Sequence, residues 1–143
     1  KVALELSDDL PIIVNDRIQV EQVLMNLVRN GSEAMDETPA GSRRLSIRTF
    51  RDGKDAVGVE ISDAGKGIRP EELEVVFRPF FTTKPQGMGM GLAISRSIVE
   101  ASGGRLWATA NQGPGGCTFH FTLPVGKRSG STTAAHGDRS RGP

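Results

Sequence analysis

The stretch Gly87-Met88-Gly89-Met90-Gly91-Leu92 leads directly into a segment, Ala93 to Ala101, whose pattern is typical of a helix. Glycine at every second position removes the Cβ atoms, so the backbone can adopt positive φ angles and lie close to a ligand. The first amide groups of a helix have no partner within it, and with the positive end of the helix dipole they favour a bound phosphate. The stretch therefore predicts a phosphate-binding loop, although similar stretches also occur as plain turns.

The residues on either side of this stretch extend the pattern. Residues 78–90 contain Pro79, Pro85, Gly87 and Gly89, which predicts a mobile loop of about a dozen residues. Loops of that length in a compact domain are usually functional or disordered. On the other side, the helix is expected to end at Ser102, before Gly103-Gly104.

Alternation of apolar and polar residues predicts strands in the rest of the chain. The expected strands are residues 1–6, 11–14, 43–52, 56–62, 105–110 and 116–125. Two further helices are expected, a long one from Arg17 to about Met35 with Asp16 as its N-cap and a short one from Glu71 to Phe77. The mixture of helices and strand hairpins predicts an α+β fold, with one mixed sheet and helices on one face.

Length and composition narrow the class of protein. A chain of 143 residues is long enough for one domain with a proper core, and the loss of apolar residues after Pro124 predicts a domain over 1–125 and a flexible tail over 126–143. The single Cys117 excludes an internal disulfide, and a net charge of +1 gives no argument for a nucleic-acid partner. Without an apolar run of about 20 residues or a signal peptide pattern, we expect a cytoplasmic domain that belongs to a longer protein.

The helix expected at 17–35 carries a polar stripe opposite its apolar side. At about 100° per residue this stripe consists of Gln19, Gln22, Asn26, Asn30 and Glu33. Asn is a poor helix former because its side chain competes for the backbone, yet two Asn residues stand four positions apart in mid-helix. Their amide oxygens suit a Mg²⁺ ion that keeps most of its waters and binds phosphates, whereas the plain alternative is a solvated helix face.

A second candidate site follows the strand expected at 56–62. Asp63 stands before Gly65, Gly67 and Ile68, and its carboxylate can accept a hydrogen bond from an exocyclic amine such as that of adenine. The glycines allow a tight turn beneath a flat base. An ordinary Asp-Gly turn with a surface carboxylate is the alternative. A Ca²⁺ loop is excluded, because the regular series of acidic ligands is missing.

Five segments in this order resemble the N, G1, F, G2 and G3 boxes of the catalytic and ATP-binding domain of sensor histidine kinases. The segments are Asn26–Asn30, Asp63–Ile68, Phe77–Lys84, Gly87–Leu92 and Gly116–Pro124. The superfamily also holds gyrase, Hsp90 and MutL, and the resemblance covers about residues 1–125. The sequence Arg-Pro-Phe-Phe-Thr-Thr-Lys at 78–84 is similar to the corresponding segment of PAS-linked kinases of the nitrogen-regulation and oxygen-sensing type.

The resemblance implies a fold and a set of functional residues. The fold is a two-layer α/β sandwich of the Bergerat type, with a mostly antiparallel sheet of about five strands covered on one face by about three helices. The implied ligands are ATP or ADP and Mg²⁺, with Asn30 on the metal and Asn26 beside it near the phosphates. The implied catalytic residues are Asn26, Asn30 and Lys84. The implied nucleotide-binding residues are Asn30, Asp63, Gly65, Gly67, Ile68, Thr83, Lys84, Gly87, Gly89, Gly91, Leu92 and Thr118.

The sequence departs from the family pattern at three places. Gly31 stands where Ala is usual, which weakens the helix by up to about 1 kcal/mol. Glu33 stands where many members carry a cation for the phosphates, so Lys84 or Arg29 has to serve instead. The last box has Gly116-Cys117 in place of Gly-Thr, so a thiol or the hydroxyl of Thr118 replaces a hydroxyl near the base.

Two functions are compatible with the resemblance. One is a histidine kinase module that passes the γ-phosphate to a histidine on a separate dimerisation domain, with a response regulator as the next partner. The alternative is an ATP-hydrolysing switch of the Hsp90, gyrase or MutL type, in which a Glu four residues before the metal-binding Asn acts as general base. Here that position is Asn26, whose amide cannot take a proton at neutral pH, so the sequence favours the kinase. A regulatory nucleotide-binding module without chemistry is a third possibility.

The chain itself offers no acceptor of the family type. Neither His120 nor His136 is followed by Glu or Asp on a helix, and His120, between Phe119 and Phe121 in a strand, is expected at the surface. We therefore expect a fragment that binds nucleotide with Mg²⁺ but does not phosphorylate itself. The fragment is expected to be a monomer and the full-length protein a homodimer.

Overall fold

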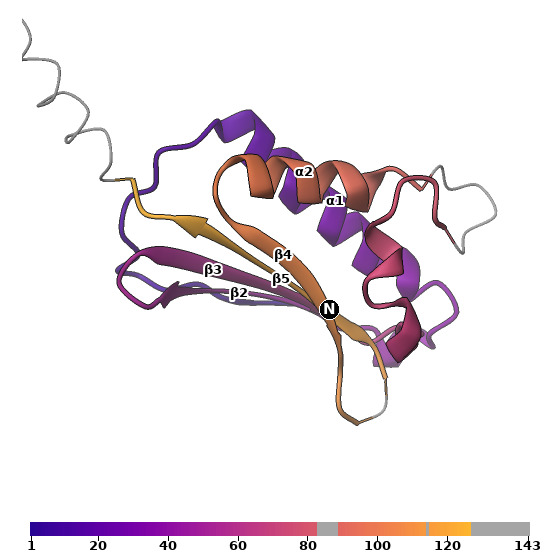
Figure 1. Ribbon diagram of the computed structural model, residues 1–143. Helices are drawn as coiled ribbons and strands as arrows, with labels where there is room; N and C mark the ends of the chain where they lie inside the picture. The colour runs from indigo at the N-terminus through magenta and orange to yellow at the C-terminus, as the bar shows by residue number, and fades with distance from the viewer. Residues whose placement is uncertain (83–88, 114, 127–143) are drawn as a thin grey trace, which may run out of the picture.

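The computed structural model of the protein describes residues 1–82, 89–113 and 115–126, which form one sheet with two helices on the same face (Figure 1). The strands follow the order β1-β2-β3-β5-β4. Their bounds are β1 Val2–Glu5, β2 Leu45–Asp52, β3 Ala56–Asp63, β4 Arg105–Ala110 and β5 Cys117–Pro124. β1 pairs with β2 in parallel and every other pair is antiparallel. The predicted α+β fold with a mixed, mostly antiparallel sheet is confirmed.

The two α-helices begin and end close to the predicted residues. Helix α1 is Arg17–Ala34, and the side chain of Asp16 accepts hydrogen bonds from the amides of Ile18 and Gln19, which makes it the predicted N-cap. Helix α2 is Gly91–Ala101 and is followed by Gly103 at φ 88°. Capping and the glycine stop are local signals, and for this reason the sequence predicted both helices well.

Two short elements differ from the prediction. Residues 11–14 are not a strand: Pro11 has no amide hydrogen to donate, and Ile12 and Val14 are 83% and 68% exposed. Residues 71–77 are not one α-helix but two 3₁₀ turns, Pro70–Glu72 and Val75–Phe77. The second turn carries Val76 and Phe77 into the core, where both are buried, so tertiary packing overrides the helical pattern.

The hydrophobic core lies between the helices and the sheet. β5 alternates strictly, so Cys117, Phe119, Phe121 and Leu123 are buried while the residues between them are only partly covered. Phe119 and Phe77 meet edge to face, with ring centroids 6.0 Å apart. Together with Leu27 from α1 and other buried side chains, these rings fix the distance between the helices and the sheet.

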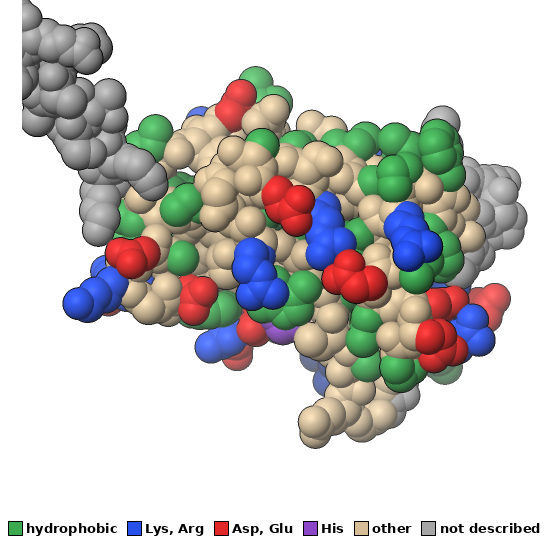
Figure 2. Space-filling model, viewed as in Figure 1, with side chains coloured by type: hydrophobic (Ala, Val, Ile, Leu, Met, Phe, Trp, Pro, Cys, Tyr) green, Lys and Arg blue, Asp and Glu red, His purple; other side chains and the backbone are tan. Residues whose placement is uncertain are grey.

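The view in Figure 2 shows charged side chains of both signs scattered among hydrophobic ones, in keeping with the net charge of +1. Among the residues that the structure describes, no helix is both long enough and apolar enough to cross a membrane.

His120 is more covered than predicted, with a side chain that is only 17% exposed on the sheet face opposite the helices. Its ring stacks on Trp107 at a centroid distance of 5.0 Å. Nε2 lies 2.8 Å from Thr109 Oγ1, and Nδ1 lies 3.4 Å from Glu60 Oε2. His120 thus faces away from Phe119 and Phe121, as expected, but its ring is only partly exposed, because the cross-strand neighbours Trp107 and Glu60 cover much of it. Burial lowers the pKa of His120, and Glu60 opposes this shift.

We expect His120 to make stability fall on acidification. Because its pKa is lower in the folded state, the unfolded chain binds more protons just below pH 6.5, so the free energy of unfolding decreases as pH falls through this range. Urea denaturation at pH 7 and pH 5 measures the effect. The decrease should be smaller in His120→Gln, and an equal decrease in both proteins would contradict the prediction.

Candidate nucleotide-binding site

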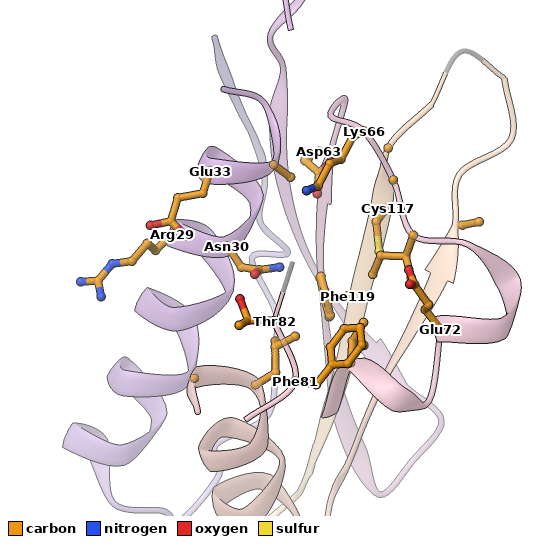
Figure 3. Close-up of a pocket in the computed structure, with 18 of the residues that line it drawn as sticks. Arg29, Asn30, Glu33, Asp63, Lys66, Glu72, Phe81, Thr82, Cys117 and Phe119 are labelled. Carbon is orange, nitrogen blue, oxygen red and sulfur yellow. The ribbon is translucent and has the colours of Figure 1, made fainter. Parts of the chain in front are cut away.

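A cavity of about 900 Å³ opens between α1, the end of β3, the start of α2 and the residues before β5 (Figure 3). This volume lies within the range of about 300–1,000 Å³ that is usual for small-molecule sites. Most of the described residues that were predicted to bind nucleotide or metal line it: Asn26, Asn30, Asp63, Gly67, Ile68, Gly89, Gly91 and Leu92. Segments far apart in sequence thus meet in one place.

Helix α1 supplies the polar wall of the cavity. Figure 3 shows Asn30 pointing from the helix into the space below Asp63, whereas the end of Arg29 extends away from it. Asn26, one turn earlier, donates its amide hydrogens to Gly91 O at 3.3 Å and to Ser95 Oγ at 3.0 Å. The polar stripe is therefore more than a solvated helix face, because Asn26 connects α1 to the start of α2 by hydrogen bonds.

Asp63 is the last residue of β3 and is 4% exposed. Its carboxylate accepts a hydrogen bond from Gly65 N at 2.8 Å and another from the amide of Cys117. Burial raises the pKa of Asp63, and these two amide hydrogen bonds counteract the increase. Since a carboxylate has about four acceptor positions, it can still accept a hydrogen bond from a ligand. The alternative of an ordinary surface carboxylate is wrong.

Gly65 acts through packing and does not line the cavity. A Cβ atom there would lie 2.3 Å from the carbonyl oxygen of Ala34, at the end of α1. The next residue, Lys66, donates its backbone amide to the same oxygen at 3.1 Å. The loop after β3 is thus held against α1, and Lys66 lines the cavity.

Thr118 does not line the cavity either. Strand alternation places it on the sheet face opposite Cys117 and Phe119, both of which line the cavity. Its hydroxyl lies 2.6 Å from Asn111 Oδ1, so it does not replace a hydroxyl next to the base. Asn111 does line the cavity, and the sequence analysis missed it because its role depends on a contact between distant strands.

The predicted residues Thr83, Lys84 and Gly87 lie outside the residues that the structure describes. At the described ends of this segment, Phe80 N donates to Gly89 O at 2.8 Å. Gly89 has a φ of 72°, and a Cβ atom there would lie 2.4 Å from the carbonyl carbon of Phe80. Only glycine satisfies both conditions, which accounts for the middle glycine of the stretch 87–92.

Cys117 forms part of the cavity wall but is 2% exposed, and burial next to Asp63 raises the pKa of its thiol to about 12. We expect the folded chain to react very slowly with a thiol reagent at pH 8, because only about 10⁻⁴ of the thiol is ionised at that pH. The rate of reaction with an aromatic disulfide reagent, with and without denaturant, measures this. Fast reaction of the folded chain, checked against Cys117→Ser, would contradict it.

Comparison with known proteins identifies the family. The chain belongs to the histidine kinase-, DNA gyrase B- and HSP90-like ATPases, whose family model matches residues 15–127. It is 44% identical over 125 residues to the sensor protein FixL of Bradyrhizobium diazoefficiens, covering 87% of this chain and 24% of FixL. It is 46% identical over 125 residues to the C4-dicarboxylate transport sensor protein DctS of Rhodobacter capsulatus, covering 87% of this chain and 19% of DctS. The resemblance to sensor histidine kinases is confirmed, and the chain spans about a quarter or less of these relatives.

Solved structures agree with this assignment. The full-length histidine kinase ShkA in complex with AMPPNP superposes with a TM-score of 0.76 at 25% identity, covering 88% of this chain and 26% of ShkA. The histidine kinase ThkA in complex with the response regulator protein TrrA superposes with a TM-score of 0.69 at 34% identity, covering 86% of this chain and 33% of that chain. The fold is therefore that of histidine kinase catalytic domains.

Proposed function

We propose that this chain is the ATP-binding catalytic module of a two-component sensor kinase, and that it transfers the γ-phosphate of ATP to a histidine on a separate domain. The observation that carries the proposal is Asn26. It lines the cavity one helical turn before Asn30, and α2 holds its amide through Gly91 and Ser95. An amide cannot act as a general base on water at neutral pH, so this position favours phosphate transfer over hydrolysis.

In this proposal the base of ATP lies at the Asp63 end of the cavity. The Asp63 carboxylate accepts a hydrogen bond from the exocyclic amine, and Ile68 and Gly67 line the wall beside it. The phosphates lie toward Asn30 and the start of α2, where the first amides of the helix, which have no partner within the helix, and the helix dipole favour negative charge. Phosphate transfer needs positioning and charge neutralisation more than covalent chemistry, and this is what these groups provide.

The residues around Asn30 fit a magnesium ion. The amide of Asn30 points into the cavity, and its oxygen is a hard donor of the kind that Mg²⁺ binds, whereas the carboxylate of Glu33 lies on the Arg29 side of the helix (Figure 3). Within residues 1–82, 89–113 and 115–126, no group of three or more His, Cys, Asp or Glu side chains forms a complete metal cage. This suits Mg²⁺, which is usually held by one or two protein oxygens together with water and substrate phosphates. The ion would neutralise charge on the phosphates.

The partners of the module follow from the same proposal. The phosphoacceptor histidine belongs to a dimerisation domain outside this chain, and the phosphate then passes to a response regulator. The solved complex of ThkA with TrrA and the greater length of FixL and DctS support this arrangement. We infer a cytoplasmic site of action, a monomeric fragment and a dimeric full-length protein, with no nucleic-acid partner.

We expect the isolated chain to bind Mg-ADP and Mg-ATP but not to phosphorylate itself. Incubation with γ-labelled ATP should leave the chain unlabelled, since both ring nitrogens of His120 already face Thr109 and Glu60. Label on His120, lost in His120→Gln, or label on His136 would contradict this. The function itself is tested in the full-length protein, where label should appear on another domain and should be lost in Asn30→Ala. Steady release of phosphate without label would favour the hydrolysing switch instead.

A further inference from the structure

The side chain of Asn111 contacts the backbone of Asp63 at the end of the sheet. The ladder between β3 and β5 ends with the pair Ser62 and Thr118. Just beyond this pair, the amide of Cys117 donates to the carboxylate of Asp63, which leaves the backbone carbonyl oxygen of Asp63 to another donor. The side chain of Asn111, which follows β4, provides that donor: its amide donates to the carbonyl oxygen of Asp63 at 2.9 Å. It replaces the hydrogen bond that the ladder would otherwise have supplied.

The orientation of the Asn111 amide is fixed by its other neighbours. Nδ2 also lies 3.2 Å from Ser62 Oγ, and Oδ1 lies 2.6 Å from Thr118 Oγ1. Because an amide oxygen only accepts, Thr118 donates to it and the NH₂ group must face Asp63. The Thr118 and Ser62 hydroxyls lie 2.9 Å apart and complete a closed polar ring.

The same residue holds the segment that precedes β5. The backbone amide of Asn111 donates to Gly116 O at 3.1 Å. A Cβ atom on Gly116, whose φ is 102°, would lie 2.0 Å from the carbonyl oxygen of Asp63 and 2.8 Å from Asn111 Nδ2. The end of β3 and the residues before β5 are therefore in direct contact around Asn111. The Cys117 amide, one of the two donors that orient the Asp63 carboxylate, belongs to this unit.

From these contacts we propose that Asn111 is a positioning residue for Asp63 and thereby sets the preference of the cavity for a base that carries an exocyclic amine. The inference rests on the proposed function, because it takes Asp63 as the group that recognises the base. Asn111 acts through the backbone of Asp63 and through the Gly116–Cys117 segment. Thr118, on the other face of β5, contributes by fixing the Asn111 amide.

The test compares ADP with inosine diphosphate (IDP), which carries a carbonyl oxygen in place of the amine. In the unmodified chain, calorimetry should show tighter binding of ADP, since the IDP carbonyl faces a carboxylate. Asn111→Ala is expected to weaken ADP binding about 10-fold and IDP binding less than about 2-fold, so the preference narrows. Thr118→Val should reduce the preference for ADP over IDP by a smaller factor. Gln112→Ala, at the exposed neighbouring residue, is the matched control and should change neither affinity.

An equal loss for both nucleotides, or an unchanged ratio, would overturn the role of Asn111, because a purely structural residue affects both ligands alike. If Asn111→Ala does not fold, as judged by circular dichroism, the nearly isosteric Thr118→Val decides: an unchanged ratio in this variant overturns the inference. If the unmodified chain binds neither nucleotide, the proposed function fails together with the inference. If the chain binds nucleotide but the variants keep the same preference for ADP over IDP, only the inference about Asn111 is overturned and the proposed function stands.

Discussion

Replacing Asp63 by asparagine is expected to weaken ADP binding about 10- to 100-fold, which corresponds to about 1–3 kcal/mol. Two backbone amides already point at this carboxylate, from Gly65 and Cys117. The NH₂ group of asparagine must therefore face either one of these amides or the exocyclic amine of the base. In both orientations a donor meets a donor in a site where the side chain is 4% exposed.

Calorimetric titration with ADP measures the effect, and Asp52→Asn is the matched control because Asp52 is an exposed carboxylate at the far end of β2. The folded structure should persist in Asp63→Asn, because the substitution replaces a buried carboxylate, whose charge is disfavoured by burial, with a neutral amide of the same shape. Circular dichroism checks this point. Equal ADP affinity in Asp63→Asn and in the unmodified chain would show that Asp63 does not bind the base.

Replacing Phe119 by alanine is expected to lower the free energy of unfolding by about 3–5 kcal/mol. Phe119 is 1% exposed, contacts Phe77 edge to face and forms part of both the core and the cavity wall. Domains are stable by only about 5–15 kcal/mol, so the variant should lose a large part of its stability. Urea denaturation followed by circular dichroism gives the value.

The control is Phe119→Leu, which keeps most of the apolar volume and should cost clearly less than Phe119→Ala. Thr122→Ser, on the partly covered face of the same strand, keeps the hydroxyl that accepts from Arg105 N and should stay close to the unmodified chain. A loss below 1 kcal/mol in Phe119→Ala would mean that the packing of the Val75–Phe77 turn on β5 contributes little to stability.

Much of the fold could be predicted because its signals are local. The Asp16 cap, the Gly103 stop and the alternation in β5 depend only on neighbouring residues, and the structure has each of them where the sequence indicated. Residues 11–14 and 71–77 were predicted wrongly because burial, which depends on distant residues, decides their conformation. Pro11 also removes a ladder donor from the first of these segments.

The residues of the candidate site were predicted from family motifs. Where this chain differs from those motifs, the reason lies in contacts of the folded structure that the motifs do not describe. Gly31 is buried in α1, where a Cβ atom would lie 2.9 Å from Leu45 Cδ1 and 3.5 Å from Asp63 Cβ. The usual alanine would thus require the end of the Leu45 side chain on β2 to move, whereas its contact with Asp63 would be an ordinary one. Asn111 and the cover over His120 depend on which strands are neighbours, and the order β3-β5-β4 is a property of the whole sheet.

The hydrogen bond between Phe80 and Gly89 also bears on how this domain can evolve. This bond, with an N–O distance of 2.8 Å, connects Phe80 directly to Gly89 beside the cavity. Gly89 is essential to this contact, because its φ is 72° and a Cβ atom there would lie 2.4 Å from the carbonyl carbon of Phe80. We therefore expect natural variants of this domain to keep glycine at position 89, because any larger residue would have to displace the backbone of Phe80.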